Sequence, residues 1–287
     1  MVKTKFETVT MHDGASVYTA RFEPEGELKG VIQATHGFSE HVYRYQELGE
    51  FFANNGYAFV INDMRGFGKM PDKTLRQRKA AQGLIIDYNS ILKDMVTIRG
   101  KIDKYYPNVP VVLYGYSLGG NVALNLLHKY KQCRYDKLIL AAPWLQLYNQ
   151  PSDFVIFGMK KQAILNPTLT FQTGLDTSRM ARPVDGVEYD RSDDDYFHSR
   201  MSFKLFLRTD ATGKHAIKNA KNFTIPTLLL VPGQDMIVCP NAMRKFHANS
   251  GGNVIIVEYP DAYHALHYDL VKHEFMERML YFIANSA

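Results

Sequence analysis

Residues 111–124 have the sequence VVLYGYSLGGNVAL, in which a short apolar run leads into three glycines around one serine. A continuous run of Val, Leu and Tyr, without alternating polar residues, is typical of a strand buried on both faces. Gly115 and Gly119 carry no Cβ, so the chain can reverse sharply between them. A helical pattern starts at Leu118. We therefore interpret the stretch as a strand, a tight turn with Ser117 at its tip, and a helix.

The same strand–helix pattern recurs along the chain. Further apolar runs predict buried strands at residues 30–35, 57–62, 137–142, 227–231 and 254–259. Helical stretches lie between the runs, at 45–54, 84–106, 118–128, 241–248 and 268–285. Two β-rich runs, 5–11 and 16–22, flank a His-Asp-Gly turn and predict an N-terminal hairpin. This alternation predicts an α/β fold with a mostly parallel central sheet and helices on both faces.

Residues 145–204 interrupt the alternation. They contain many apolar and aromatic side chains but no clean buried strand, and they are too many for a plain loop. We interpret the segment as an inserted helical cap. The predicted division is a core of residues 1–144 and 205–287 and a cap of residues 145–204.

Composition excludes several classes of protein. With 287 residues, 46% of them hydrophobic, and a net charge of +5, the chain is not intrinsically disordered. The longest apolar stretch, residues 138–145, is far too short to cross a membrane. The first ten residues have no apolar segment of the kind a secretory signal needs. The two cysteines, Cys133 and Cys239, cannot form a disulfide framework, so we expect a reducing compartment and a cytoplasmic protein.

A basic run occupies residues 69–79. It carries five Lys or Arg and one acid, Asp72, and no aromatic residues are interleaved as a nucleic-acid surface would need. We interpret it as a solvated surface loop and expect no nucleic-acid partner.

The turn at Ser117 matches the pattern G-x-S-x-G between a strand and a helix, the nucleophile elbow of serine hydrolases. A serine hydroxyl needs a base to take its proton and an acid to orient that base. In this architecture the chain order is Ser, acid, His. Asp235 follows the predicted strand 227–231, and His264 follows the last strand, 254–259. We therefore predict Ser117 as nucleophile, Asp235 as acid and His264 as base.

Each prediction has a rival. His267, expected within the last helix, could replace His264 as the base, or the two histidines could bind a metal, although no further ligand cluster supports a metal site. Asp261 and Glu258 could replace Asp235, but both are too close to His264 in sequence to approach it from another strand.

A tetrahedral intermediate needs N–H donors for its oxyanion. The backbone N–H of Leu118, the residue after the nucleophile, is one candidate. The other is the N–H of Phe38, in the loop after strand 30–35, where Gly37 lets the backbone turn. His36 in the same loop could act as a second base, but we favour a role in supporting the loop.

Five motifs in order, HGFSEH, NDMRGFG, GYSLGG, VPGQDMIV and YPDAYHALHYD, resemble the α/β-hydrolase group of monoacylglycerol lipases, lysophospholipases and serine aminopeptidase S33-type enzymes. The resemblance spans about residues 5–285. It implies an α/β-hydrolase fold and the same roles for Ser117, Asp235 and His264, without a cofactor. This chain departs from the group at Ser39, which replaces the second Gly of H-G-x-G-E-H, and at Phe67, which replaces the His of R-G-H-G.

Three functions are open. The leading hypothesis is hydrolysis of a small carboxylic ester with an apolar acyl chain, with transient contact to a membrane surface. The second is an aminopeptidase related to prolyl aminopeptidases, in which acids between Asp190 and Asp195 would anchor the substrate amine. The third is a non-catalytic protein that binds a small apolar ligand.

Overall fold

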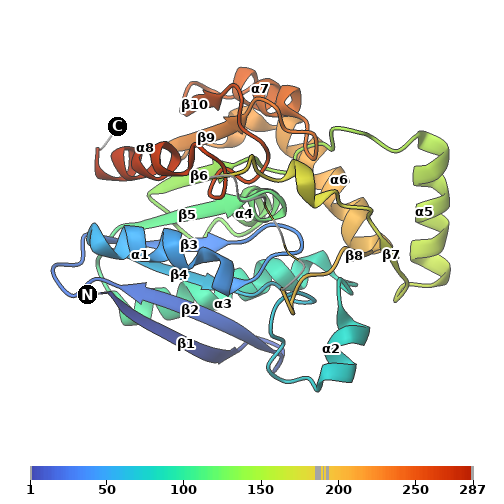
Figure 1. Ribbon diagram of the computed structural model, residues 1–287, viewed down its shortest axis with the longest axis horizontal. Coiled ribbons are helices and arrows are strands. Elements are labelled where there is room, and N and C mark those ends of the chain that lie inside the picture. The colour runs from blue at the N-terminus through green and yellow to red at the C-terminus, as the bar shows by residue number, and fades with distance from the viewer. Residues whose placement is uncertain (1, 185–188, 190, 192–193, 286–287) are drawn as a thin grey trace.

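The computed structural model of the protein describes residues 2–184, 189, 191 and 194–285. At its centre is one eight-stranded sheet with the order β1-β2-β4-β3-β5-β6-β9-β10 (Figure 1). β1 pairs antiparallel with β2, and β2 with β4, whereas the remaining pairs are parallel. The strands of this sheet are β1 Lys3–Thr10, β2 Ser16–Glu23, β3 Gly30–Thr35, β4 Tyr57–Asn62, β5 Val111–Tyr116, β6 Lys137–Ala141, β9 Thr227–Pro232 and β10 Val254–Tyr259.

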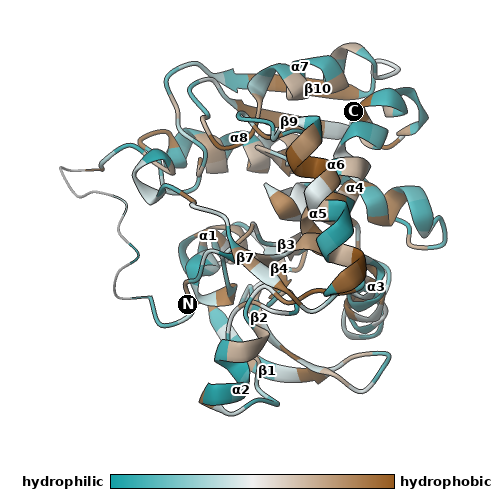
Figure 2. Cartoon of the chain, turned by 90° about the vertical axis from the view of Figure 1, so that its right-hand side faces the viewer, coloured by the Kyte–Doolittle hydropathy of each residue, from teal (hydrophilic) through white to brown (hydrophobic). Residues whose placement is uncertain are grey.

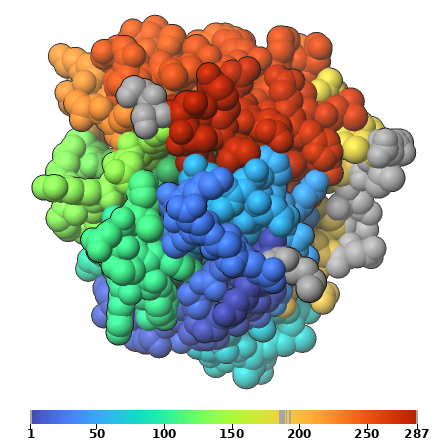
Figure 3. All heavy atoms as spheres, turned by 90° about the vertical axis from the view of Figure 1, so that its left-hand side faces the viewer, coloured from blue at the N-terminus to red at the C-terminus, as the bar shows by residue number. Residues whose placement is uncertain are grey.

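Helices cover both faces of the sheet. α1 and α8 pack together on one face, while α3, α4, α6 and α7 form a layer on the other. In Figure 3 the red atoms of α8 border the blue atoms of α1. The helices are α1 Gln46–Asn54, α2 Leu75–Ala81, α3 Tyr88–Tyr105, α4 Leu118–Lys129, α5 Asp153–Leu165, α6 Phe203–Lys218, α7 Pro240–Ala248 and α8 Lys272–Ala284, with 3₁₀ turns η1 Val42–Tyr45, η2 Thr177–Arg179 and η3 Ala220–Asn222.

These layers explain the apolar runs. β3, β4, β5 and β9 are buried along their whole length, because each is covered by helices on both sides. The predicted α/β fold with a mostly parallel sheet is confirmed, and so is the N-terminal hairpin.

Three helix predictions were wrong in detail. α2 overlaps the basic run, residues 69–79, that we interpreted as a loop. None of its residues is buried, and a capping box between Thr74 and Gln77 stabilises its start. α3 begins at Tyr88, after the N-cap Asp87, instead of at residue 84. α8 begins at Lys272, so His267 lies in the turn before it and not in the helix.

The predicted cap contains more than helix. α5 is followed by the short strand β7 Thr170–Gln172, which pairs antiparallel with β8 Arg200–Ser202. The segment expected to be helical thus also contains a small two-stranded sheet, whose first strand is not buried. α6 begins at Phe203, inside the segment assigned to the cap, and continues into the core. The division at residues 145–204 stays a prediction.

Candidate active site

Ser117 lies between β5 and α4 in a strained backbone conformation, with φ 52° and ψ −115°. The turn is tight. A Cβ on Gly119 would lie 2.2 Å from the carbonyl oxygen of Thr35, and one on Gly115 would lie 2.6 Å from the carbonyl oxygen of Gly119. The close approach of three backbone segments therefore requires glycine on both sides of Ser117.

The structure brings Ser117, His264 and Asp235 into one chain of hydrogen bonds. His264 Nε2 lies 3.0 Å from Ser117 Oγ, and His264 Nδ1 lies 2.6 Å from Asp235 Oδ2. All three side chains are buried. Asp235 is fixed in turn, because its Oδ1 accepts N–H hydrogen bonds from Ile237 and Val238 at 2.8 and 2.9 Å. The carboxyl ends of β5, β9 and β10 supply the three residues, and their catalytic roles stay predictions.

The rival residues lie elsewhere. Burial lowers the pKa of His267 to about 4, and the nearest carboxylate in an ion-pair contact is Glu40, 3.8 Å away, not Asp235. Glu258 pairs with Arg244 at the surface. Among the described residues, no group of three or more His, Cys, Asp or Glu side chains is arranged to hold a metal ion.

The loop after β3 runs alongside Ser117. A Cβ on Gly37 would lie 3.3 Å from Ser117 Cβ and 2.7 Å from the Tyr116 ring, so only glycine fits. Phe38 lines the same cavity as Ser117 and His264. Leu118 is the first residue of α4, where a backbone N–H has no partner inside the helix. Both amides are positioned near Ser117, and their function as oxyanion donors stays a prediction.

His36 supports this loop, which is the role that we favoured over a second base. Its Nδ1 lies 2.7 Å from the Gly37 carbonyl oxygen, and its Nε2 accepts the N–H of Met64 at 2.7 Å. Full burial lowers the pKa of His36 to about 4, so the ring is neutral at neutral pH.

A cavity of about 560 Å³ opens at Ser117 and His264. Its polar lining includes Asp176 and Arg179, which form a partly exposed ion pair of 3.1 Å. Most of the lining is apolar and comes from the core and the predicted cap: Trp144, Leu147, Met159, Phe171, Leu175, Met180, Phe206, Met236 and Ile237. Such a cavity suits an apolar ligand with a polar end group at the mouth.

The profile of one protein family, serine aminopeptidase S33, matches residues 26–271. The chain belongs to this family of hydrolases.

Several proteins that are similar to the chain are named as lipases. The chain is 26% identical over 238 residues to phospholipase YtpA of Bacillus subtilis, covering 82% of this chain and 88% of that protein. It is 24% identical over 261 residues to monoglyceride lipase of Rattus norvegicus, covering 90% and 82%. The crystal structure of the Paleococcus ferrophilus monoacylglycerol lipase has a TM-score of 0.81 at 24% identity, covering 94% of this chain and 99% of that one. These structural likenesses confirm the α/β-hydrolase fold.

The two departures from the family pattern meet at one residue, His198. Ser39 has φ 66°, a conformation that favours the family's usual glycine, and its Oγ donates a hydrogen bond to the His198 carbonyl oxygen. The Phe67 ring stacks on the His198 ring, with centroids 5.1 Å apart, and packs edge-on against Phe38. His198 thus joins the segment returning from the predicted cap to the loop that carries Phe38.

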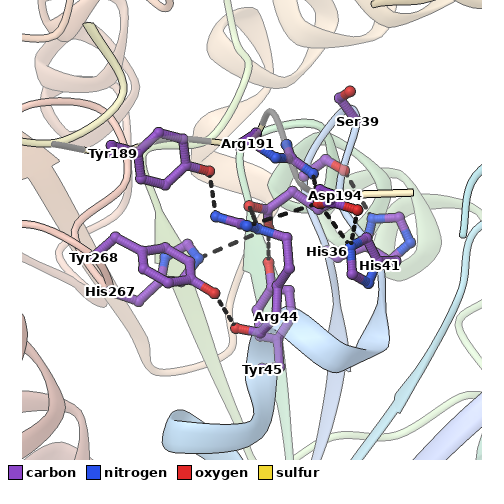
Figure 4. A network of polar contacts seen from close by, with 12 residues as sticks. His36, Ser39, His41, Arg44, Tyr45, Tyr189, Arg191, Asp194, His267 and Tyr268 are labelled. Atoms are coloured by element: carbon purple, nitrogen blue, oxygen red, sulfur yellow. Dashed lines mark hydrogen bonds and ion pairs between the residues drawn. The ribbon is translucent and has the colours of Figure 1, made fainter. Parts of the chain in front are cut away.

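A buried polar network extends this junction (Figure 4). Asp194 lies 2.9 Å from His41 Nε2 and 2.8 Å from Arg191 Nη2. Arg44 donates to the Tyr189 hydroxyl at 2.5 Å. His41 and Arg44 thus connect Asp194 and Tyr189 to the segment after β3. Sequence reasoning missed these two contacts, because partners 145 or more positions apart leave no local pattern.

The same network contains a buried carboxylate, Glu40. It accepts a hydrogen bond from the Tyr45 hydroxyl at 2.6 Å and pairs with Arg44 at 3.3 Å. Burial opposes ionisation, but attraction to His267 and Arg44 prevails and lowers the pKa of Glu40 to about 2. His267 itself stacks on Tyr45, with ring centroids 5.3 Å apart. His267 therefore belongs to the support behind His264.

The acids proposed as an amine anchor are distributed differently. Asp194 is engaged by His41 and Arg191, whereas Asp195 is exposed. Asp190 and Asp193 lie outside the described residues.

Proposed function

We propose that the protein is a serine hydrolase that cleaves carboxylic esters with an apolar acyl chain. One observation carries the proposal: the hydrogen-bonded chain from Ser117 through His264 to Asp235 opens into an apolar cavity. The names of the relatives, a phospholipase and monoglyceride lipases, support ester over amide chemistry. A monoacylglycerol or a lysophospholipid is the substrate class that fits these observations.

The proposed reaction begins when His264 Nε2 takes the proton of Ser117 Oγ as the oxygen attacks the ester carbonyl carbon. Asp235 holds the ring in the required tautomer and stabilises the imidazolium. The N–H groups of Phe38 and Leu118 would bind the oxyanion, each worth about 2.7–4 kcal/mol of barrier. His264 then protonates the leaving alcohol. Water attacks the acyl-enzyme by the same route and releases the acid.

Turnover of p-nitrophenyl esters of graded chain length tests the proposal. We expect hydrolysis that depends on acyl length, and a fall of at least about 10⁴-fold in Ser117→Ala. Wild-type protein without turnover, or turnover unchanged in Ser117→Ala, contradicts it. Labelling of Ser117 by a fluorophosphonate distinguishes an enzyme from a protein that only binds an apolar ligand. A non-catalytic protein is expected to remain unlabelled although it is folded.

Amide hydrolysis is the second candidate, because the family is described as serine aminopeptidases. Asp194 is already paired with His41 and Arg191, which argues against this carboxylate as an anchor for a substrate amine. Release of fluorophore from Pro- or Ala-aminocoumarin amides, without hydrolysis of neutral esters, would favour this candidate.

We also propose that α5 contacts lipid surfaces transiently. The helix carries Phe154 and Ile164, which are 85% and 79% exposed, while its Met159 lines the cavity. Among the described residues, no helix is long and apolar enough to span a membrane. Replacing Phe154 and Phe157 by Ser should weaken binding to phosphatidylcholine vesicles. Ile255→Ser, an exposed apolar position on β10, is the matched control and should not.

We propose a reducing compartment, with the cytoplasm as the first expectation, because Cys133 and Cys239 are both free thiols. Fractionation of cells that produce the protein tests this, and recovery from an oxidising compartment contradicts it.

A further inference from the structure

A second large cavity, of about 600 Å³, lies between the start of α3, the end of α4 and the start of α6. Ser117 is not among the residues that line it. Four basic side chains do: His128, Lys129, Lys204 and Arg208. We call this cavity, with those four residues and Asp87 and Ile86, the basic groove.

The positive charges of the basic groove are poorly compensated. Within the part of the chain that the structure describes, Lys129, Lys204 and Arg208 form no ion pair. Asp87 is the acid in the lining, and its Oδ1 is occupied as the N-cap of α3, accepting the N–H of Asn89 at 2.9 Å. Lys129 Nζ donates to the neutral Asn89 Oδ1 at 2.5 Å.

The placement of these cations is unfavourable without an anion. Lys204 and Arg208 are one turn apart on α6, a spacing at which like charges repel. The His128 ring contacts that of His215, with centroids 4.7 Å apart, so one further base adjoins the groove. An anion bound between α3, α4 and α6 would relieve this repulsion.

The lining indicates which anion fits. A guanidinium and ammonium groups together match the oxygens of a phosphate. A free phosphate is much smaller than the cavity, whereas a phosphate carried on a larger amphiphile would fill more of it. Ile86, 45% exposed, and Leu92 supply an apolar side to the groove for the rest of such a molecule.

The position of the groove indicates where that amphiphile lies. α6, which carries Lys204 and Arg208, packs against α5, whose outer side exposes Phe154 and Ile164. Figure 2 looks onto the face that carries α5, with α3 and α4 to its right. α6 thus carries cations without an ion pair and packs against a helix with exposed apolar side chains, a combination that is complementary to a lipid surface with anionic headgroups. We propose that the basic groove binds the phosphate headgroup of an anionic phospholipid in a membrane surface.

Vesicle binding tests the proposal independently of catalysis. Ser117→Ala protein is sedimented with vesicles of phosphatidylcholine alone and with equimolar phosphatidylcholine and phosphatidylglycerol. We expect tighter binding to the anionic vesicles. Adding Lys204→Gln and Arg208→Gln should weaken that binding by about 30-fold, since each cation near an anionic surface contributes a factor of about five, and should leave binding to phosphatidylcholine unchanged.

The matched control is Lys218→Gln with Lys221→Gln, which removes the same charge at the other end of α6. An equal loss in both double variants would mean a response to net charge and overturn the proposal. So would equal binding of the starting protein to both vesicle types. Stabilisation by inorganic phosphate alone, abolished in the groove variant while vesicle binding is unchanged, would assign the groove to a soluble phosphate instead.

Two further measurements keep the outcomes distinct. Thermal unfolding shows whether the groove variant is folded. With Ser117 restored, the variant should hydrolyse p-nitrophenyl butyrate at the wild-type rate, so failure of the lipid proposal leaves the proposed hydrolase activity untouched.

Discussion

Ser117 has backbone angles that an L-residue adopts only under constraint. The constraint comes from neighbouring glycines, at which there is no room for a side chain. Gly119 lies against the carbonyl oxygens of Thr35 and His36, both of which belong to the backbone. A side chain added there has nothing flexible to displace. The elbow is therefore held by the close packing of β3 against the start of α4.

Gly119→Ala should destabilise the protein, because its Cβ would lie 2.2 Å from a backbone oxygen. We expect the free energy of unfolding to fall by about 1–3 kcal/mol or more, measured by urea denaturation. Gly100→Ala in α3 is the control. Nothing lies within 4 Å of its added Cβ, so it should stabilise by about 0.5–1 kcal/mol. Equal effects at the two positions would contradict the account.

Stability should fall as the pH is lowered below about 6.5. Burial lowers the pKa of His36, His198 and His267 to about 4 each, so their stabilising contribution is complete above the unfolded value of 6.5 and is lost as pH falls through 4. Asp63 acts in the opposite direction, since burial raises its pKa to about 6. With three groups against one, we expect a loss of about 3 kcal/mol between pH 6.5 and 5, measured by urea denaturation.

His267→Gln tests the assignment of this pH dependence. The substitution should reduce by one the number of protons taken up on unfolding. The free energy of unfolding should therefore fall less steeply with decreasing pH, whatever the substitution costs at neutral pH. An unchanged slope would mean that His267 is charged or accessible in the folded protein.

At the scale of elements, the helices on one face are joined through the amide of Asn121, on α4. Its Oδ1 accepts hydrogen bonds from Tyr88 of α3 at 2.6 Å and Thr212 of α6 at 2.8 Å. Its Nδ2 donates to the carbonyl oxygens of Trp144 at 2.8 Å and Thr209 at 3.0 Å. Asn121 Oδ1 also accepts a longer hydrogen bond from Asn125 Nδ2, at 3.2 Å, so the other four contacts join α4 to its neighbours in the interior.

Asn121→Leu should therefore destabilise by about 3 kcal/mol or more, because four buried partners lose their hydrogen bond at once. Asn125→Leu, one turn along the same helix and only half-buried, should cost about 1 kcal/mol. Denaturant unfolding measures both. A loss at Asn121 no larger than that at Asn125 would show that the partners find other donors or water.

The buried strands were predictable, and the exposed helices α5 and α2 were not, for a physical reason. A strand buried on both faces gives a short apolar run bounded by turn residues, and the candidate residues followed from the ends of such strands at Ser117, Asp235 and His264. α5 is apolar on its exposed side as well as its inner side, so it has no amphipathic period. α2 is exposed on every side and gives no period either.

Over the whole molecule, the segment returning from the predicted cap is joined to the loop beside Ser117 by Asp194. The arginine it pairs with, Arg191, has a side chain only 1% exposed. Arg191 is only three positions from Asp194. The contact that joins the two segments is the one with His41, and no local pattern marks it, because it depends on how the chain returns after more than a hundred residues. His41 and Asp194 are 153 positions apart.

Asp194→Asn should lower stability by about 2 kcal/mol, since it leaves Arg191 and His41 without their carboxylate. Because Phe38 lies in the loop that is held this way, we also expect kcat for short esters to fall more than KM changes. Asp195→Asn, at the exposed neighbouring position, should change neither. Thermal unfolding and steady-state kinetics measure both variants, and equal behaviour of the two would contradict this role.

The separation of Ser117 and His264 by 147 positions also orders events during protein synthesis. The elbow, made from β3, β5 and α4, leaves the ribosome well before β9 and β10 exist. A nascent chain at that stage carries Ser117 without His264 beside it. The two side chains meet only when the last strand of the sheet pairs with β9. Under the proposed mechanism, synthesis that stalls earlier therefore leaves a protein without hydrolase activity.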